Sequence, residues 1–208
     1  MRILVNGAGG MLGYDLTEAL KSAGHAVKAF DHAGWDITDG AASEALLASE
    51  KPDWVIHCAG FTRVDDCESQ SEKAHAVNAT AAGLVAAACA SGGARMIFLS
   101  TDYVFDGRSD RPWTEMDLPA PRGVYAKSKR AGEEAVRDAL GARARILRTS
   151  WLSGGHGANF VDTILRKAWG GEQLRVVNDQ TGRPTFTTDL ADAIVALLAK
   201  PAFTEDSF

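Results

Sequence analysis

The sequence predicts an α/β fold built on a doubly wound parallel sheet. Short apolar runs alternate with helix-forming segments from the amino terminus onward, a pattern that implies parallel strands joined by right-handed crossovers. A glycine-rich turn joins the first apolar run to the first helical segment. Polar side chains directly follow several of the apolar runs. Since ligands of such sheets bind outside the carboxyl ends of the strands, these side chains are predicted to meet at one edge.

Length, composition and net charge limit the number of domains and the kinds of partner that the chain can have. The chain has 208 residues, 46% of them hydrophobic and 24% charged, enough for one full domain and part of a second, since domains usually span about 100–200 residues. The formal net charge is −5, with dispersed Lys and Arg. Nucleic acid binding needs a concentrated basic face, so we expect no nucleic acid partner.

Cysteine and histidine usage argues against disulfides and metal. The three cysteines, Cys58, Cys67 and Cys89, form neither a Cys-x-x-Cys pair nor an even set, which favours the reducing cytoplasm. The five histidines lack metal-ligand spacing, so no metal site is expected.

Met1 leads almost directly into a strand, leaving no room for a signal peptide. The apolar run 81–90 is shorter than the ~20 residues that cross a bilayer, so we expect no membrane segment.

The first strand and helix carry a dinucleotide-binding pattern. Residues 3–5 form an apolar run, glycines follow at positions 7, 10 and 13, and a helical pattern continues to Gly24. This spacing lets the backbone approach a pyrophosphate and directs helical N–H groups at it. A tight turn without a ligand is the alternative. We predict a Rossmann-like fold whose cofactor contacts include Gly7, Gly10, Met11, Leu12 and Gly13.

Two further strand ends contribute predicted cofactor contacts. Residues 25–30 form the second strand, and Asp31 at its end would accept hydrogen bonds from a ribose and repel a 2′-phosphate, which favours NADH. A plain turn residue is the alternative. The third strand spans residues 53–57, and small residues after it let a cofactor lie against the backbone. The predicted contacts beyond the glycine turn are Asp31, Asp36, Ile37, Ala59, Gly60 and Phe61.

The central segment supplies the predicted chemistry. A buried strand at residues 96–99 leads to Thr101, and a proline-containing loop leads to a helix that carries Tyr125 and Lys129. Residues four apart share a helix face, so the ammonium is expected to lower the pKa of the phenol. Tyr125 would donate a proton to a carbonyl oxygen held by Thr101, while a cofactor supplies hydride. A tyrosine packed along a lysine stem is the alternative.

Helices and strands alternate through the rest of the chain. Further helices are predicted at residues 41–49 and 69–91, the second containing Asn78, which either braces a neighbouring strand or is exposed. A fifth strand spans 143–148, a helix spans 159–169 with a core-facing stripe of Phe160, Ile164 and Leu165, a short strand spans 174–177, and a last helix spans 188–200. We predict a dinucleotide-binding domain at 1–150, and at 151–208 a partial substrate-binding lobe with a helix that returns to the first domain.

Several motifs together resemble the dTDP-4-dehydrorhamnose reductases, which belong to the extended short-chain dehydrogenase/reductases. The resemblance covers nearly the whole chain, and its most specific element is Ser100-Thr101-Asp102-Tyr103-Val104-Phe105-Asp106-Gly107. The other motifs are Gly7-x-x-Gly10-x-x-Gly13, Tyr125-x-x-x-Lys129 with Gly132-Glu133, Arg148-Thr149-Ser150-Trp151, Asn159-Phe160-Val161 and Asp179-Gln180-x-Gly182-x-Pro184-Thr185.

The resemblance implies a reaction and its residues. Thr101, Tyr125 and Lys129 would be catalytic, with Lys129 also holding the nicotinamide ribose. The reaction would be the reduction, by NADPH or NADH, of the C4 keto group of dTDP-4-dehydro-L-rhamnose to dTDP-L-rhamnose. The nucleotide sugar would contact Thr62, Tyr103, Phe105 and Trp151. Pairing into a homodimer through helices is a further expectation.

Two departures from the family pattern leave alternatives open. Family members usually continue for roughly another third of their length, and the third strand ends in His57-Cys58-Ala59-Gly60-Phe61 where the family tends to have Asn-x-Ala-Ala-Tyr. One alternative is a nucleotide-sugar epimerase or dehydratase, although dehydratases place an acid where this chain has Tyr103. The other is a non-catalytic NAD(P)-binding subunit similar to the regulatory subunit of methionine adenosyltransferase.

Overall fold

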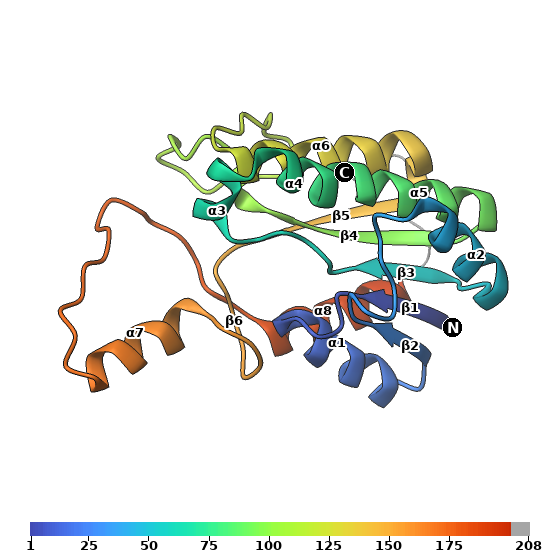
Figure 1. Ribbon diagram of the computed structural model, residues 1–208, viewed down its shortest axis with the longest axis horizontal. Helices are drawn as coiled ribbons and strands as arrows, with labels where there is room; N and C mark the ends of the chain where they lie inside the picture. Colours follow the sequence, from blue (N-terminus) through green and yellow to red (C-terminus); the bar gives the residue numbers. More distant parts are fainter. Residues whose placement is uncertain (201–208) are drawn as a thin grey trace.

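A five-stranded parallel sheet forms the centre of the molecule, as the computed structural model shows for residues 1–200, the part of the chain that the structure describes (Figure 1). The strand order is β2-β1-β3-β4-β5, and every pairing is parallel. The strands are Arg2–Asn6 (β1), Ala26–Phe30 (β2), Trp54–His57 (β3), Arg95–Thr101 (β4) and Ala144–Thr149 (β5). The predicted α/β class and parallel sheet are confirmed. The order reverses between β1 and β3, which is where such sheets bind ligands.

Helices cover both faces of the sheet (Figure 1). One face packs against Gly40–Glu50 (α2), Ala81–Gly92 (α5) and Val124–Leu140 (α6), with Val85, Phe98 and Val136 in the shared core. The other face packs against Met11–Ser22 (α1) and Thr187–Ala199 (α8), with Leu16, Ile97 and Ile194 between the layers. The nearly continuous apolar strands β3 and β4 fit this arrangement, because a sheet covered on both faces buries both sets of side chains.

The helix predicted at 69–91 forms from Ser71 to Gly92, with a π-helical turn inside it. Short helices Val64–Ser69 (α3) and Ser71–His75 (α4) precede a π-helical turn, Ala76–Thr80 (η1), which continues into α5. Asn78 lies in this π-turn and is 1% exposed. Single π-turns inside helices are uncommon and often occur at functional sites. The widened turn directs the Asn78 side chain toward the loop that follows β3.

Helix α6 approaches the π-turn closely at one glycine. A Cβ built on Gly132 would lie 2.2 Å from the carbonyl oxygen of Asn78 and 2.9 Å from Cζ of Phe98. Gly132 therefore allows contact that any side chain would prevent. Short 3-10 turns flank the neighbouring strands, at Asp102–Val104 (η2) and Gly141–Arg143 (η3).

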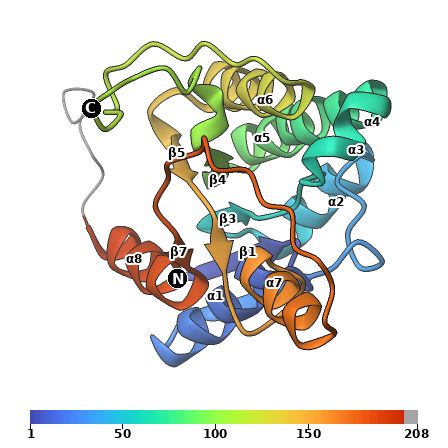
Figure 2. The same ribbon diagram turned by 90° about the vertical axis from the view of Figure 1, so that its left-hand side faces the viewer.

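The carboxyl-terminal part of the chain leaves the sheet and returns to it. Two short parallel strands, Leu152–Ser153 (β6) and Thr185–Phe186 (β7), pair beside the main sheet, and Phe160–Trp169 (α7) lies between them in sequence. Helix α7 and the segment after it lie beyond the carboxyl edge of the sheet in both views (Figures 1 and 2). Helix α8 then packs against α1. The division into domains at residue 150 stays a prediction, and residues 201–208 of the predicted lobe lie outside the described residues.

Two sequence predictions for this part are wrong. The stripe on α7 is not core, because Phe160 is 61% exposed and Leu165 is 42% exposed. Residues 174–177 form no strand, and Val176 and Val177 are exposed. Both patterns are apolar, yet within residues 1–200 no layer covers α7 and no strand edge lies beside 174–177.

One helical stretch passes the length and composition test for a membrane span. It covers Ser71–Gly92, and half of its most apolar window is buried inside the fold. The buried side chains of its second half, including Val85 and Cys89, belong to the core between the helices and the sheet.

The contact at Gly132 predicts an effect on stability. Gly132→Ala should lower the free energy of unfolding by about 1–3 kcal/mol, because the added methyl group forces α6 away from the π-turn. Urea denaturation measures this change. Gly92→Ala is the matched control, since a Cβ there meets nothing within 4 Å and helical Gly→Ala replacements are stabilising by about 0.5–1 kcal/mol. Equal stability of both variants would contradict the packing argument.

Candidate active site

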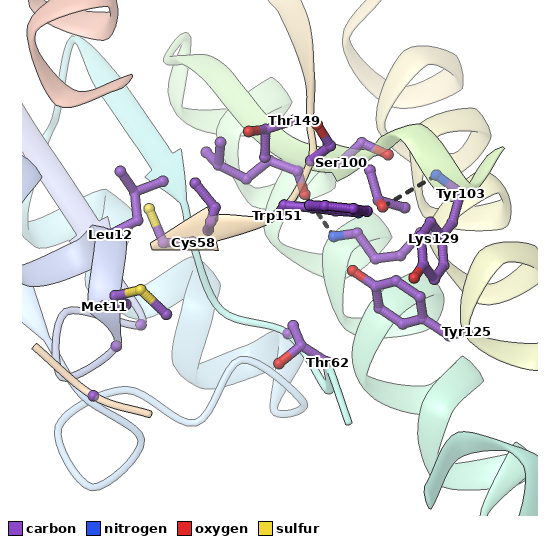
Figure 3. A pocket seen from close by; sticks show the side chains of 18 of the residues that line it. Met11, Leu12, Cys58, Thr62, Ser100, Tyr103, Tyr125, Lys129, Thr149 and Trp151 are labelled. Atoms are coloured by element: carbon purple, nitrogen blue, oxygen red, sulfur yellow. Dashed lines mark hydrogen bonds between the residues drawn. The ribbon is translucent and has the colours of Figure 1, made fainter. Parts of the chain in front are cut away.

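A cavity of about 650 Å³ opens at the carboxyl edge of the sheet. It is lined by the ends of β1, β3, β4 and β5, the start of α1, helix α6 and the segment around Trp151. Figure 3 shows Met11 and Leu12 on one side, with Tyr103, Tyr125, Lys129 and Trp151 on the other. The structure brings these predicted site residues to the cavity: Gly7, Gly10, Met11, Leu12, Gly13, Ala59, Gly60, Thr62, Thr101, Tyr103, Tyr125, Lys129 and Trp151.

The glycine turn is folded tightly against the end of β3. Gly7 has φ +67°, and a Cβ there would lie 2.6 Å from the amide nitrogen of Ala59. A Cβ on Gly13 would lie 2.3 Å from the carbonyl oxygen of Gly7. Only glycine fits at both positions. The first turn of α1 carries neither a side-chain cap nor an acidic residue, so its N–H groups are available to an anion in the cavity.

An asparagine that the sequence analysis did not single out joins β1 to β3. The amide nitrogen of Ala59 donates to Oδ1 of Asn6 at 3.1 Å, and Nδ2 of Asn6 lies 2.9 Å from Nδ1 of His57. Asn6 is 1% exposed. Burial lowers the pKa of His57 to about 3, so the ring is neutral. The position of Asn6 directly before the glycine turn is the signal that sequence reasoning missed.

Asn78 braces the loop after β3 and joins it to α6. Its Oδ1 accepts from the amide of Phe61 at 2.7 Å, while Nδ2 donates to the carbonyl of Phe61 at 2.9 Å and to Oγ of Ser128 at 3.0 Å. The open choice between a bracing and an exposed residue is thus settled in favour of bracing, although the partner is a loop rather than a strand. These bonds fix the loop that lines the cavity relative to the helix that carries Tyr125.

Thr101 and Tyr125 meet at the end of β4. Oγ1 of Thr101 accepts from the amide of Tyr103 at 3.2 Å, a bond drawn in Figure 3, and donates to Asp102 at 3.2 Å. The two bonds hold the Thr101 side chain at the cavity wall. Thr101 also shares a hydrogen bond with the phenol of Tyr125. The rings of Tyr103 and Tyr125 are arranged edge to face, with centroids 6.0 Å apart.

The predicted lowering of the Tyr125 pKa is wrong. Burial raises the pKa of Tyr125 to about 12, and the hydrogen bond with Thr101 offsets only part of this effect. The charge of Lys129 alone would lower this pKa, but the loss of water around the buried phenol raises it by more. Tyr125 is therefore fully protonated at neutral pH.

Lys129 is buried at the centre of the site. It is 4% exposed, and its Nζ donates to the carbonyl oxygen of Leu99 at 2.6 Å (Figure 3) and lies 4.1 Å from the centre of the Phe98 ring. Burial lowers the pKa of Lys129 to about 8, and the charge of Glu133 opposes this shift.

Glu133, a buried carboxylate on α6, binds two partly buried arginines. It is 0% exposed and accepts from Nε and Nη2 of Arg148 at 2.8 and 2.7 Å and from Nη1 of Arg130 at 3.0 Å. These bonds outweigh burial and lower the pKa of the carboxyl group. The ion pairs connect α6 to β5. Glu133 and Arg148 belong to separate motifs, and their spacing in the sequence does not predict the contact between them.

Five predicted site residues do not line the cavity. Phe61 is buried under Lys73 and Arg63, whose charged groups lie 5.0 and 5.5 Å from its ring centre. Phe105 stacks on Trp113 at 4.6 Å, with Arg148 over its ring at 5.0 Å. Asp31, Asp36 and Ile37 follow β2.

The residues after β2 lie beside the glycine turn. Asp31 accepts from the amide of Gly34 at 2.9 Å, and a Cβ on Gly9 would lie 3.8 Å from Cβ of Asp31. Asp36 is exposed and caps a turn with Thr38. Ile37 is 5% exposed, and its side chain packs in the core. Asp31 thus lies beside the glycine turn, whereas the Ile37 side chain faces away from the solvent. The cofactor contacts of both residues stay predictions.

Within residues 1–200, no group of three or more His, Cys, Asp or Glu side chains is arranged to hold a metal ion. The absence of a metal site stays a prediction for the whole chain.

The fold is Rossmann-like, and its cavity at the sheet edge is lined by Thr101, Tyr125 and Lys129. Residues 1–207 match the family model described as RmlD substrate binding domain. The chain belongs to this family. It is 47% identical over 201 residues to the dTDP-4-dehydrorhamnose reductase of Mycobacterium tuberculosis (strain H37Rv), an alignment that covers 94% of this chain and 65% of the relative.

Solved structures of similar proteins have the same fold. A dTDP-4-dehydrorhamnose reductase from Clostridium acetobutylicum superposes with a TM-score of 0.91 at 41% identity, covering 95% of this chain and 70% of the other. That of Bacillus anthracis, solved in complex with NADP, gives a TM-score of 0.91 at 38% identity, covering 96% and 71%. The chain thus spans about two thirds of the length of its relatives.

The buried lysine predicts a pH dependence of stability. The unfolded chain keeps the Lys129 proton up to its ordinary pKa of 10.5, whereas the folded protein releases it from about 8. Unfolding therefore takes up a proton between these values, and raising the pH favours the folded state. Relative to Lys129→Met, wild-type stability should rise by about 3 kcal/mol between pH 7.5 and 10.5, as measured by urea denaturation. Lys127→Met, at an exposed position of α6, keeps Lys129 and should therefore show the same rise as wild type relative to Lys129→Met. Wild type and Lys129→Met with the same pH dependence of stability would refute the argument.

Proposed function

We propose that the protein reduces the C4 keto group of dTDP-4-dehydro-L-rhamnose to dTDP-L-rhamnose with NADPH or NADH. One observation carries the proposal: the glycine turn and the side chains of Thr101, Tyr125 and Lys129 line the same cavity. A dinucleotide held at the turn would then be within reach of a carbonyl group at the phenol. The three relatives described above are named dTDP-4-dehydrorhamnose reductases.

The residues at the glycine turn fit a dinucleotide. The close backbone packing at Gly7 and Gly13 leaves the uncapped start of α1 facing the cavity, and such helix starts bind pyrophosphate groups. Asp31 beside Gly9 fits the adenosine ribose, and Ala59 and Gly60 leave room along the loop after β3. The reduced cofactor supplies hydride to the substrate carbon when it is bound.

The other wall supplies a proton. The raised pKa of Tyr125 keeps its phenol protonated at neutral pH, so Oη can donate a proton to the carbonyl oxygen as hydride reaches C4. The carbonyl carbon would gain a hydrogen and its oxygen a proton, which leaves a carbon–oxygen single bond; a bound reduced dinucleotide would supply the hydride. Thr101 orients the phenol and the substrate oxygen through its hydroxyl. Lys129, one helical turn away, stabilises the developing phenolate and holds the nicotinamide ribose.

The cavity also offers surfaces for the sugar nucleotide. Thr62, Tyr103 and Trp151 line it, and Tyr103 and Trp151 are 37% and 42% exposed. Partly exposed aromatic rings suit the apolar face of a sugar or a pyrimidine base. Phe105 lies under Trp113 and Arg148, so we assign it a supporting contact behind this wall.

The alternatives fit the site less well. Dehydratases need an acid directly after the Thr-Asp pair, and this position holds Tyr103. A regulatory subunit that only binds NAD(P) does not require Thr101, Tyr125 and Lys129 to meet at one cavity. An epimerase regenerates its cofactor in each turnover, whereas a reductase consumes it.

We propose a cytoplasmic location, since the three cysteines are free thiols, two of them buried, as expected in a reducing compartment. Pairing into a homodimer stays part of the proposal, as does the absence of nucleic acid and membrane partners.

Tyr125→Phe should separate chemistry from binding. The loss of the proton donor should lower turnover by about 10²–10⁴-fold, while the Kd for NADPH changes little, because the phenyl ring still fills the site. Stopped-flow absorbance at 340 nm and fluorescence titration measure the two quantities. Tyr14→Phe, on α1 and outside the cavity lining, is the matched control. An equal loss of binding and turnover would show that Tyr125 serves packing instead.

The reaction itself is tested by cofactor consumption. With dTDP-4-dehydro-L-rhamnose, one NADPH should be oxidised for each sugar reduced. The assay is run on the 208-residue chain and on a chimera that adds the carboxyl-terminal third of the M. tuberculosis relative. Product formation without net NADPH oxidation, or no product from either protein, would overturn the proposal.

A further inference from the structure

Trp151 has an unusual backbone conformation for a bulky residue. Its φ is +47°, and it is one of two non-glycine residues with positive φ in residues 1–200. This region is strained for residues with a large side chain and persists only where the surroundings hold it. The strain lies at the cavity, because the indole of Trp151 lines it (Figure 3).

The surroundings that hold Trp151 come from the distant segment 182–185. The amide of Thr185 donates to the carbonyl oxygen of Trp151 at 3.2 Å, and Oγ of Ser150 donates to the carbonyl oxygen of Arg183 at 2.7 Å. The pairing of β6 with β7 begins immediately afterwards, at Leu152 and Thr185. These bonds fix the backbone on both sides of the strained residue.

Gly182 provides the surface on which the indole rests. A Cβ on Gly182 would lie 2.8 Å from Cε2, 2.9 Å from Cζ2 and 3.1 Å from Nε1 of Trp151. Gly182 does not have positive φ, so its backbone does not require glycine and only the lack of a side chain matters. Gly182 is also not part of the cavity lining. The indole therefore lies between Gly182 and the cavity.

We infer that Gly182 is a positioning residue for the substrate wall: its bare backbone seats the indole of Trp151, and this seat sets how far the ring extends into the space for the sugar nucleotide. This inference rests on the proposed function for the identity of the substrate. A side chain at position 182 pushes the indole into the cavity. A narrower cavity at Trp151 would weaken binding of the nucleotide sugar. It would leave the binding of the dinucleotide unchanged, because that binds at the glycine turn on the other side of the cavity.

Kinetics of single and double variants test the inference. Gly182→Ala should raise KM for dTDP-4-dehydro-L-rhamnose by about 10–100-fold, since ångström-scale misplacement of a site residue has effects of this size, while the Kd for NADPH stays within about twofold. Trp151→Phe has a smaller ring. The added methyl group should therefore have little effect in the double variant, and the two changes should be strongly non-additive. Gly155→Ala, where a Cβ meets nothing within 4 Å, should behave as wild type.

A readout that needs no turnover keeps this test separate from the proposed function. In protein labelled with 5-fluorotryptophan, the fluorine resonance of Trp151 is assigned by its loss in Trp151→Phe. Gly182→Ala should shift this resonance and leave the other four tryptophan resonances in place. If wild type does not reduce the sugar nucleotide, the proposed function fails. The fluorine resonance alone then tests whether Gly182 positions the indole of Trp151.

Two results would overturn the inference. One is an unmoved Trp151 resonance in Gly182→Ala, and the other is a rise in KM that is equally large in the Trp151→Phe background. If Gly182→Ala does not fold, Ser150→Ala replaces it, because removal of the bond to Arg183 loosens the same seat without adding atoms. That variant should move the Trp151 resonance, and an unmoved one would contradict the inference.

Discussion

The buried carboxylate of Glu133 determines where helix α6 lies relative to the sheet. Its bonds to Arg148 cross from the helix to strand β5. Removing one partner of such a buried pair typically costs about 3–5 kcal/mol, because the other charge is left without compensation. Tyr125, Lys129 and Glu133 are spaced four residues apart, so they share one face of α6. The ion pair thereby fixes the proposed proton donor and its lysine at the end of β4.

The opposite wall depends on backbone packing instead of charge. Gly7 and Gly13 let the first turn press against the end of β3, and Asn6 and Asn78 hold the loop that follows β3. Asn78 also bonds to Ser128 on α6. The two walls are thus joined by a side chain from the π-turn, and the cavity between them has a defined width. A reaction between a bound cofactor and a substrate carbonyl requires such fixed spacing.

Local patterns in the sequence predicted much of this arrangement. The glycine spacing, the Tyr-x-x-x-Lys pair and the apolar strands each depend on residues close together in the chain, and the parallel topology places their ends at one edge. The pairing of Glu133 with Arg148 and the clamp by Asn78 could not be predicted, since both join residues far apart in sequence. The stripe on α7 failed for a related reason: amphipathicity shows that a helix face is apolar but not what covers it. The prediction of a lowered pKa for Tyr125 was wrong because the spacing of two residues in the sequence does not show how deeply they are buried.

The central claim is that hydride passes from a nicotinamide to a sugar carbonyl at the Tyr125 wall. The most direct measurement is isotope transfer from NADPH deuterated at C4 to dTDP-4-dehydro-L-rhamnose, with the product analysed by mass spectrometry and NMR. Our account predicts one deuteron at C4 of the product sugar in ordinary water. A product that carries no deuterium at C4, or that gains it there only from deuterated solvent, would contradict the account.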